Sequence, residues 1–487
     1  MKKLKLGLLA LSVLAVAACK KSSDNAQVAA PQIQVGKLIS NTAPLAAGSY
    51  KGTFQAGQTY TVNGNITVNA GDTLLIQKGV TINMAKGANF FVNGILVSLG
   101  TSDAPTTITY PGPANNPRVK THGAISTAAT DSAYAGGWGG IYCSVTCPKL
   151  IIKWTHIDFG GAALAAAPFP APTLAKAGSQ YLIFFENPNG LLVLEDSWMY
   201  GSPDDATRFY GGAMNIMRNT LEKLGGVGGD GLNAKGSSYG NMAYNIIIGG
   251  ATNGTKTASD NTTSTECQFT MYNNTYVNDG FRNTGVYGAR SGSIEVENAS
   301  RVSAYNNLIV DCDFGLRIAG GPGGAKVYLA DTLYNTSGYI LHTSYGYNFY
   351  YGDNAAMVNQ FVPTSVAQPV VTHPQSTDIP NMKALLGPTY TFGFIYDLSS
   401  TLVGANNPKF VNFPLPQTQT QWIQQSSIDS FDFHLGAGSP AIGKGTTTAF
   451  TPITTGIPID ANFGASEITA PGADMGCYQT NGTGNHH

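Results

Sequence analysis

The sequence predicts an all-β fold, a right-handed parallel β-helix (a solenoid) with long loop excursions. Charged residues make up only 11% of the 487 residues, whereas Gly alone accounts for 59, a composition typical of extended and tightly turned β structure. Short apolar runs follow one another at intervals too short for crossover helices. A signature containing Asn also recurs at a spacing that fits one solenoid coil.

The N-terminus has the features of an export signal. A Lys-rich start precedes an apolar run over residues 6–18 that is too short to span a membrane. The run ends in Val16-Ala-Ala-Cys19, which resembles the bacterial lipobox. We therefore expect residues 1–18 to be a lipoprotein signal peptide and Cys19 to carry the lipid that tethers the protein to a membrane. This predicts a location at the outer membrane or cell surface.

Residues 19–45 are rich in Ala, Gln, Asn and Pro and show little periodicity, which predicts a flexible tether. Removal of residues 1–18 takes away three Lys and leaves 24 basic against 28 acidic residues. This balance gives no electrostatic attraction for nucleic acid. The Gly-rich stretch 225–231 lacks the strand-to-helix setting of a dinucleotide site, so we expect no nucleotide either.

Five cysteines remain beside Cys19. Cys143 and Cys147 could form a local disulfide or stay as two buried thiols, and the sequence leaves both alternatives open. No paired His spacing accompanies them, so we expect no metal there. No cofactor is expected, although Ca²⁺ bound by acidic side chains stays open as an alternative.

The first strands of the solenoid are recognisable as short runs. Runs over 66–69, 73–77, 80–83 and 90–97 are separated by Gly, Asn or Asp. Three consecutive runs are expected to form the three faces of one coil.

Further along, a Tyr or Arg commonly precedes Asn at positions that repeat. The equivalent residues are Asn219, Asn245, Asn274, Asn307 and Asn335, at spacings of 26, 29, 33 and 28 residues. An Asn at the same turn of each coil can donate its amide to the next coil and so satisfy the turn backbone. The repeat therefore predicts an Asn ladder.

These repeats place the β-helix over residues 46–427. Two stretches interrupt it, an Ala/Pro-rich insertion near 162–177 and a Pro-containing insertion near 348–421. Exposed strand edges at the end of a solenoid would template aggregation. We therefore expect residues 428–478 to be a C-terminal capping segment, with 479–487 as a tail.

Several motifs add a resemblance. They are Trp138-Gly-Gly-Ile141, Trp154-Thr-His-Ile-Asp-Phe-Gly-Gly161 and the closing segment from Asp432-Phe-His-Leu435 to Tyr478. Together with residues 58–110 they resemble secreted right-handed parallel β-helix repeat lipoproteins of Gram-negative bacteria. The closing segment departs at Gln479, where an acidic residue commonly stands. The resemblance implies an architecture only, because this fold hosts enzymes, adhesins and spacers.

Alignment of the coils on the Asn ladder gathers charged residues on one side. The candidate catalytic residues are Asp279, Asp311, Asp313, Glu295, Glu297, Arg282 and Arg317, and the candidate substrate-binding residues are Asp230, Lys235 and Arg290. A glycoside hydrolase needs two carboxyl groups at the scissile bond, and a polysaccharide lyase needs a base and a cation. The alternative is that these side chains form ladders of ion pairs along the solenoid wall.

The sequence favours a cell-surface lipoprotein that binds extracellular polysaccharide without cleaving it. Abundant Tyr supplies faces for sugar rings, and the low charge suits neutral sugars better than a highly anionic polymer. Two alternatives stay open. One is a polysaccharide lyase or glycoside hydrolase acting in a groove along the β-helix, and the other is a structural spacer or adhesin.

Overall fold

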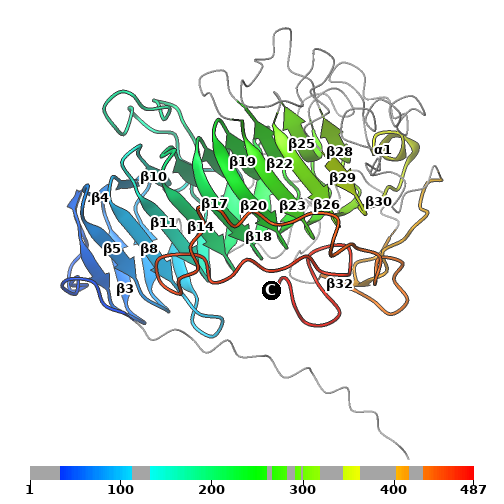
Figure 1. Ribbon diagram of the computed structural model, residues 1–487. Coiled ribbons are helices and arrows are strands. Elements are labelled where there is room, and N and C mark those ends of the chain that lie inside the picture. Colours follow the sequence, from blue (N-terminus) through cyan, green and yellow to red (C-terminus); the bar gives the residue numbers. More distant parts are fainter. Residues whose placement is uncertain are drawn as a thin grey trace, which may run out of the picture.

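The computed structural model describes residues 33–111, 132–226, 228–259, 266–281, 291–297, 300–318, 344–361, 402–415 and 431–487. The described chain winds into a parallel β-helix with three sheets of ten strands each (Figure 1). Successive strands join different sheets, and each strand pairs in parallel with its equivalent in the next coil. The predicted all-β solenoid is confirmed. No helix in these ranges is long and apolar enough to cross a membrane.

The first sheet contains β1 (Gly48–Ser49), β4 (Ile66–Val68), β7 (Phe90–Val92), β10 (Ile141–Cys143), β13 (Ile183–Phe185), β16 (Thr207–Phe209), β19 (Leu232–Lys235), β22 (Asn253–Ala258), β25 (Gly292–Glu297) and β28 (Leu316–Ile318). The second contains β2 (Gly52–Phe54), β5 (Thr73–Ile76), β8 (Ile95–Leu99), β11 (Lys149–Lys153), β14 (Leu191–Glu195), β17 (Gly212–Met217), β20 (Ser238–Ala243), β23 (Gln268–Tyr272), β26 (Arg301–Tyr305) and β29 (Ser344–Gly346).

The third sheet contains β3 (Thr59–Val62), β6 (Thr81–Met84), β9 (Thr106–Thr109), β12 (Thr155–Asp158), β15 (Trp198–Ser202), β18 (Thr220–Leu224), β21 (Ile246–Ile248), β24 (Thr275–Val277), β27 (Leu308–Val310) and β30 (Phe349–Tyr351). Outside the coils lie the antiparallel pair β31 (Phe410–Asn412) and β32 (Asp432–Leu435), the 3₁₀ turn η1 (Ser132–Tyr134) and the helix α1 (Ala355–Val358). The expected insertion 162–177 lies between β12 and β13.

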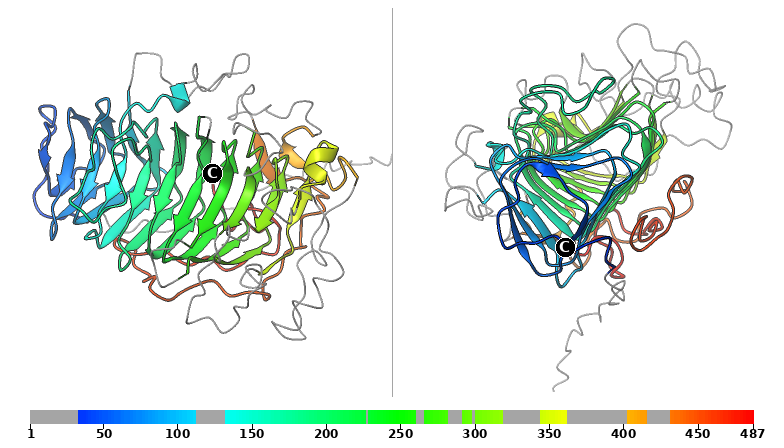
Figure 2. Two further views of the ribbon diagram at one scale, coloured as in Figure 1. Left: turned by 90° about the horizontal axis from the view of Figure 1, so that it is seen from above. Right: turned by 90° about the vertical axis from the view of Figure 1, so that its left-hand side faces the viewer.

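Alternation along each strand builds the core, because successive side chains point to opposite faces of a sheet. In the second sheet Leu150 is in register with Leu192, and Leu192 with Met214, so apolar side chains stack from coil to coil. All three are buried in one apolar core that the three sheets enclose (Figure 2, right). The sequence folds this way because short apolar runs supply one inward residue at each matching position.

The corner between the second and third sheets carries the predicted Asn ladder. The amide of Asn219 donates to the side-chain oxygen of Asn245 at 2.8 Å, and Asn245 donates to Asn274 at 3.0 Å. Asn274 donates to Asn307 at 3.0 Å. The next rung is Asn348, which accepts from Asn307 at 3.0 Å. The ladder is therefore confirmed for its first four residues.

We expected Asn335 as the fifth rung, and Asn335 lies outside the described residues. The rung is Asn348 because Tyr347 and Asn348 repeat the same two-residue corner. Tyr347 adopts a positive φ of 54°, as the residue before each earlier rung does. Residues 348–361 thus form β30 of the last described coil and the segment with α1 that follows it. We had expected the insertion 348–421 to begin at residue 348.

Helix α1 covers the C-terminal end of the described coils. Asn354 caps its N-terminus by accepting a hydrogen bond from the backbone of Met357. Val358 and Phe361 are buried in the main core, and the Phe361 ring lies 5.3 Å from that of Tyr350 in β30. This short segment therefore covers the core at the end of the described coils.

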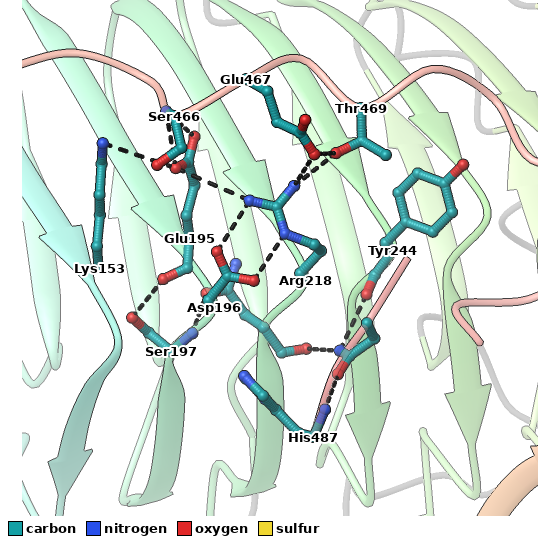
Figure 3. A network of polar contacts seen from close by, with 12 residues as sticks. Lys153, Glu195, Asp196, Ser197, Arg218, Tyr244, Ser466, Glu467, Thr469 and His487 are labelled. Carbon is teal, nitrogen blue, oxygen red and sulfur yellow. Dashed lines mark hydrogen bonds and ion pairs between the residues drawn. The ribbon is translucent and has the colours of Figure 1, made fainter. Parts of the chain in front are cut away.

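The C-terminal segment, residues 431–487, runs along the side of the coils (red in Figure 1). Its apolar residues cover the outer faces of two sheets. Ile457 and Ala465 pack on the second sheet, while Met475 and Cys477 pack on the third. A polar network fastens it to the corner between these sheets (Figure 3).

Arg218 lies at the centre of this network and has 2% of its surface exposed. It donates to both oxygens of Asp196 at 2.7 and 2.9 Å, and it reaches Thr469 at 2.5 Å in the C-terminal segment. Glu195 accepts from the backbone of Ser466 at 3.0 Å. Burial raises the pKa of Glu195, against the lowering effect of the Arg218 charge. The network therefore anchors the segment through buried charges on adjacent coils.

All five described cysteines are free and buried. Of the two alternatives for Cys143 and Cys147, the structure has two thiols that both face the core. Burial raises the pKa of the Cys143 thiol well above its usual value, and the neighbouring Cys147 adds to that shift.

Candidate functional site

The outer face of the first sheet brings polar and aromatic side chains together, most of them buried. At the level of Tyr142 and Phe184, the insertion between β12 and β13 packs on this face through Leu164, Phe169 and Ala175. The hydrogen bonds of the C-terminal segment go to the other two sheets and to their shared corner, for example to Lys153 in β11 and Thr275 in β24. Within the described ranges, the C-terminal segment therefore does not cover the outer face of the first sheet.

Strand alternation places two columns of residues on this face. Phe209 and Ala234 are in register and both belong to the core, so their neighbours point outward. The central column contains Phe184, Arg208, Asn233, Lys256, Glu295 and Arg317. The second column contains Tyr210, Lys235, Ala258 and Glu297. Charged and aromatic residues of six successive coils therefore share one face of the sheet.

Two carboxylates lie side by side at the edge of β16 and β19. The amide of Asn233 donates to Asp205 at 3.0 Å and to Asp230 at 2.7 Å. Arg208 donates to Asp205 through Nε at 2.7 Å and also through Nη2. The Asp205 carboxylate accepts the backbone N–H of Asp230 at 2.8 Å, and Asp230 in turn accepts that of Asn253 at 3.2 Å. These acids thus form a second ladder of hydrogen bonds, in which each carboxylate accepts a backbone N–H group at the turn of the next coil.

Glu295 forms the centre of a second charged group two coils further along. It is fully buried and lies 3.0 Å from Arg317 and 3.5 Å from Lys256. Asn253 donates at 2.7 Å to Oε2, the oxygen that also faces Lys256. Lys256 also pairs with Glu297 at 3.0 Å. Each carboxylate of this group has a cation as its partner.

The electrostatics of the face shift several pKa values toward neutrality. Burial raises the pKa of Asp205 to about 6, and the charge of Asp230 adds to the shift. Burial raises the pKa of Glu295 to about 7. Burial lowers the pKa of Lys235 to about 8, and the charges of Lys256 and Arg208 lower it further. Such shifts cluster at functional sites but also occur in structural ion-pair networks.

Aromatic rings border the acid pair on the side of the earlier coils. Tyr181 and Tyr210 are half-buried. The Arg208 guanidinium lies 5.2 Å from the centre of the Tyr181 ring and donates to the Tyr210 hydroxyl at 3.4 Å. Phe184 stacks on Tyr181 with ring centres 5.9 Å apart and contacts Tyr210 at 6.0 Å. We call Tyr181, Phe184, Arg208 and Tyr210 the aromatic patch.

Comparison with family models, curated proteins and solved structures finds no significant match.

The first sheet brings five of the sequence-predicted residues onto one face. They are Asp230, Lys235, Glu295, Glu297 and Arg317. Arg282, Arg290 and Cys19 lie outside the described residues. Among the described residues, no group of three or more His, Cys, Asp or Glu is placed to hold a metal ion.

The other three predicted acids lie at the turn after the third sheet. Asp279 accepts from the backbone N–H of Gly250 in the preceding coil at 2.5 Å. Asp311 accepts from that of Asp353 in the following coil at 3.0 Å. Asp313 donates its backbone N–H to the carbonyl of Asp279 at 2.9 Å. All three are buried, and burial beside Asp353 raises the pKa of Asp311 well above its usual value. Their described contacts satisfy turns between coils.

Sequence reasoning missed Tyr181, Asp205, Arg208, Tyr210 and Lys256. Asp205 stands next to Asp204 in the sequence, and such an acidic pair fits a solvated loop as well as a site. A usable signal was the alternation in Thr207-Arg-Phe-Tyr210, where Phe209 points inward and its neighbours point outward. The sequence does not show the register of β16 on β19. It therefore could not show that Arg208 and Tyr210 lie beside Asn233 and Lys235 of the next coil.

Proposed function

We propose that this protein is a cell-surface lipoprotein that binds extracellular polysaccharide, without cleaving it, through the aromatic patch on the first sheet. The observation that carries the proposal is that two half-buried tyrosines flank one arginine on the outer face of a rigid sheet. Sugar rings present apolar C–H faces that pack on aromatic side chains, while arginine donates to hydroxyl oxygens.

The rigidity of the sheet supports this proposal. Phe184 and Arg208 lie on adjacent strands in register, and Phe184 holds the ring of Tyr181 by stacking. Side chains that are already ordered lose little conformational entropy when a ligand binds. A repeating polymer could follow the face along the axis of the β-helix, which is several coils long.

The noncatalytic form is favoured by how the carboxylates are used. Asp205 and Asp230 accept backbone N–H groups of the next coil, and Glu295 accepts from Asn253 and pairs with Arg317. These bonds tie the acids to the wall of the solenoid. Cleavage by Asp205 and Asp230 stays the second candidate, because Asn233 bridges the two groups and Asp205 has a raised pKa.

The test uses the full chain in a neutral detergent with a panel of neutral and acidic polysaccharides. We expect retention on at least one polymer, and about fivefold weaker binding for Tyr181→Ala or Tyr210→Ala, since each ring contributes on the order of 1 kcal/mol. Tyr50→Ala, a half-buried tyrosine of the first coil, is the control. New reducing ends that vanish in Asp205→Asn would establish an enzyme instead, and no retention on any polymer would leave the spacer alternative.

A further inference from the structure

Lys235 differs from the other cations of the first sheet in its surroundings. Arg208, Lys256 and Arg317 each pair with a carboxylate of the wall. No hydrogen bond or ion pair joins the Lys235 ammonium group to any described residue. The side chain is half-buried, so it is ordered by the wall and still reaches solvent.

The register explains why this lysine has no acidic neighbour on its own column. Lys235 pairs with Ala258 in the next coil, and Ala258 pairs with Glu297 one coil beyond. The methyl group of Ala258 offers no acceptor, and Glu297 is held by Lys256 at 3.0 Å. On the preceding coil the corresponding residue is Tyr210, which follows Phe209, the partner of Ala234. Lys235 therefore stands between a tyrosine ring and a small side chain.

Four charged groups act on Lys235 from the neighbouring strands. Lys256 and Arg208 disfavour its charge, whereas Asp230 and Asp205 favour it. With a pKa of about 8, the amine is mostly protonated at neutral pH. A partly buried ammonium group without a counter-ion is costly unless something pairs with it. A bound anion would provide that partner beside the Tyr210 ring.

We propose that Lys235 recognises one acidic substituent, a carboxylate or a sulfate, on a sugar that packs against Tyr210. This inference rests on the proposed polysaccharide binding and names the class of polymer. Asp204, Asp205 and Asp230 lie close enough to the patch to repel a polymer with a charge on every sugar. The polymer that fits has acidic groups spaced by neutral sugars.

The experiment measures affinities of the full chain in neutral detergent for four probes. Hyaluronan alternates a uronate with a neutral sugar, and its carboxyl-reduced form is the uncharged match. κ-Carrageenan carries sulfate on alternating sugars, and polygalacturonate carries a carboxylate on every sugar. We expect hyaluronan or κ-carrageenan to bind on the order of tenfold more tightly than the reduced polymer, the difference expected from one charge-assisted hydrogen bond. Which of the two binds identifies carboxylate or sulfate.

Three variants make the result specific to Lys235. Lys235→Met should remove the preference for the acidic polymer, and Lys235→Arg should keep it. Lys86→Met removes an exposed charge elsewhere and should change nothing. Equal affinity of Lys235→Met and the parent chain, or equal binding of hyaluronan and its reduced form with no binding of κ-carrageenan, would overturn the inference while the proposed function stands. Failure to bind all four probes would overturn both for these polymers.

Discussion

Replacement of Arg218 by Met tests whether buried charges anchor the C-terminal segment. Arg218 is almost fully buried and forms a bidentate ion pair with Asp196, which is 3% exposed. Met keeps much of the side-chain volume but leaves the Asp196 carboxylate without its guanidinium partner. Breaking a buried ion pair by removing one partner costs about 3–5 kcal/mol.

The C-terminal partner Glu467 provides the contrast. Its side chain is 54% exposed and lies 3.4 Å from Arg218. An exposed pair contributes at most about 1 kcal/mol, so Glu467→Ala should destabilise the fold far less than Arg218→Met. The double variant Asp196→Asn with Arg218→Met should regain part of the loss, since it removes both charges.

Tryptophan fluorescence during urea unfolding is a suitable assay. The ring of Trp198 lies 3.9 Å from that of His487, and the ring of Trp154 lies 6.3 Å from that of His486. The signal therefore reports release of the C-terminal segment as well as unfolding of the coils. We expect Arg218→Met to lower strongly the urea concentration at the midpoint of the first unfolding transition. A midpoint no lower than that of Glu467→Ala would refute the role assigned to the buried network.

Three further predictions concern the ladder, the cap and the face of the first sheet. Asn245→Ala removes four ladder hydrogen bonds and should cost about 2–3 kcal/mol in urea unfolding, since it leaves buried polar groups unsatisfied; a cost below about 0.5 kcal/mol would contradict the ladder's role. Phe361→Ala should cost about 3–5 kcal/mol, because a buried ring that covers the core is lost, and an unchanged midpoint would show that α1 does not cap the solenoid. Binding of an acidic polymer should fall as the pH rises from 7 through the pKa of Lys235, about 8, because only the protonated amine pairs with an anion. Lys235→Arg should remove this fall, and a parent chain that binds equally at pH 7 and pH 10 would contradict the assignment.

The sequence predicted the solenoid well because its repeats are local. The corner that holds Asn219, Asn245, Asn274 and Asn307 is two residues long in every coil, so the residues before and after each rung keep their spacing. The runs 66–69, 73–77 and 80–83 likewise fall on β4, β5 and β6, one in each sheet. Strand period and turn composition are sufficient to show such a pattern.

The site was predicted only in part because its spacing varies. The segments that join the first and second sheets differ in length from coil to coil, so Asn233 and Lys256, which are in register, lie at different distances before their ladder residues, Asn245 and Asn274. Register in a sheet comes from backbone pairing, here Asn233 with Lys256, and sequence spacing cannot supply it across a variable loop. The acids after the ladder, Asp279 and Asp311, keep their spacing but serve turns between coils.

Hydroxyl-radical footprinting of the full chain, with and without each polysaccharide of the panel, locates the bound polymer on the protein. Mass spectrometry then measures the oxidation of each tyrosine. We expect a bound polysaccharide to protect Tyr181 and Tyr210, while Tyr50 in the first coil stays as reactive as in the free protein. Binding that leaves both patch tyrosines unprotected would contradict the claim that this face of the first sheet contacts polysaccharide.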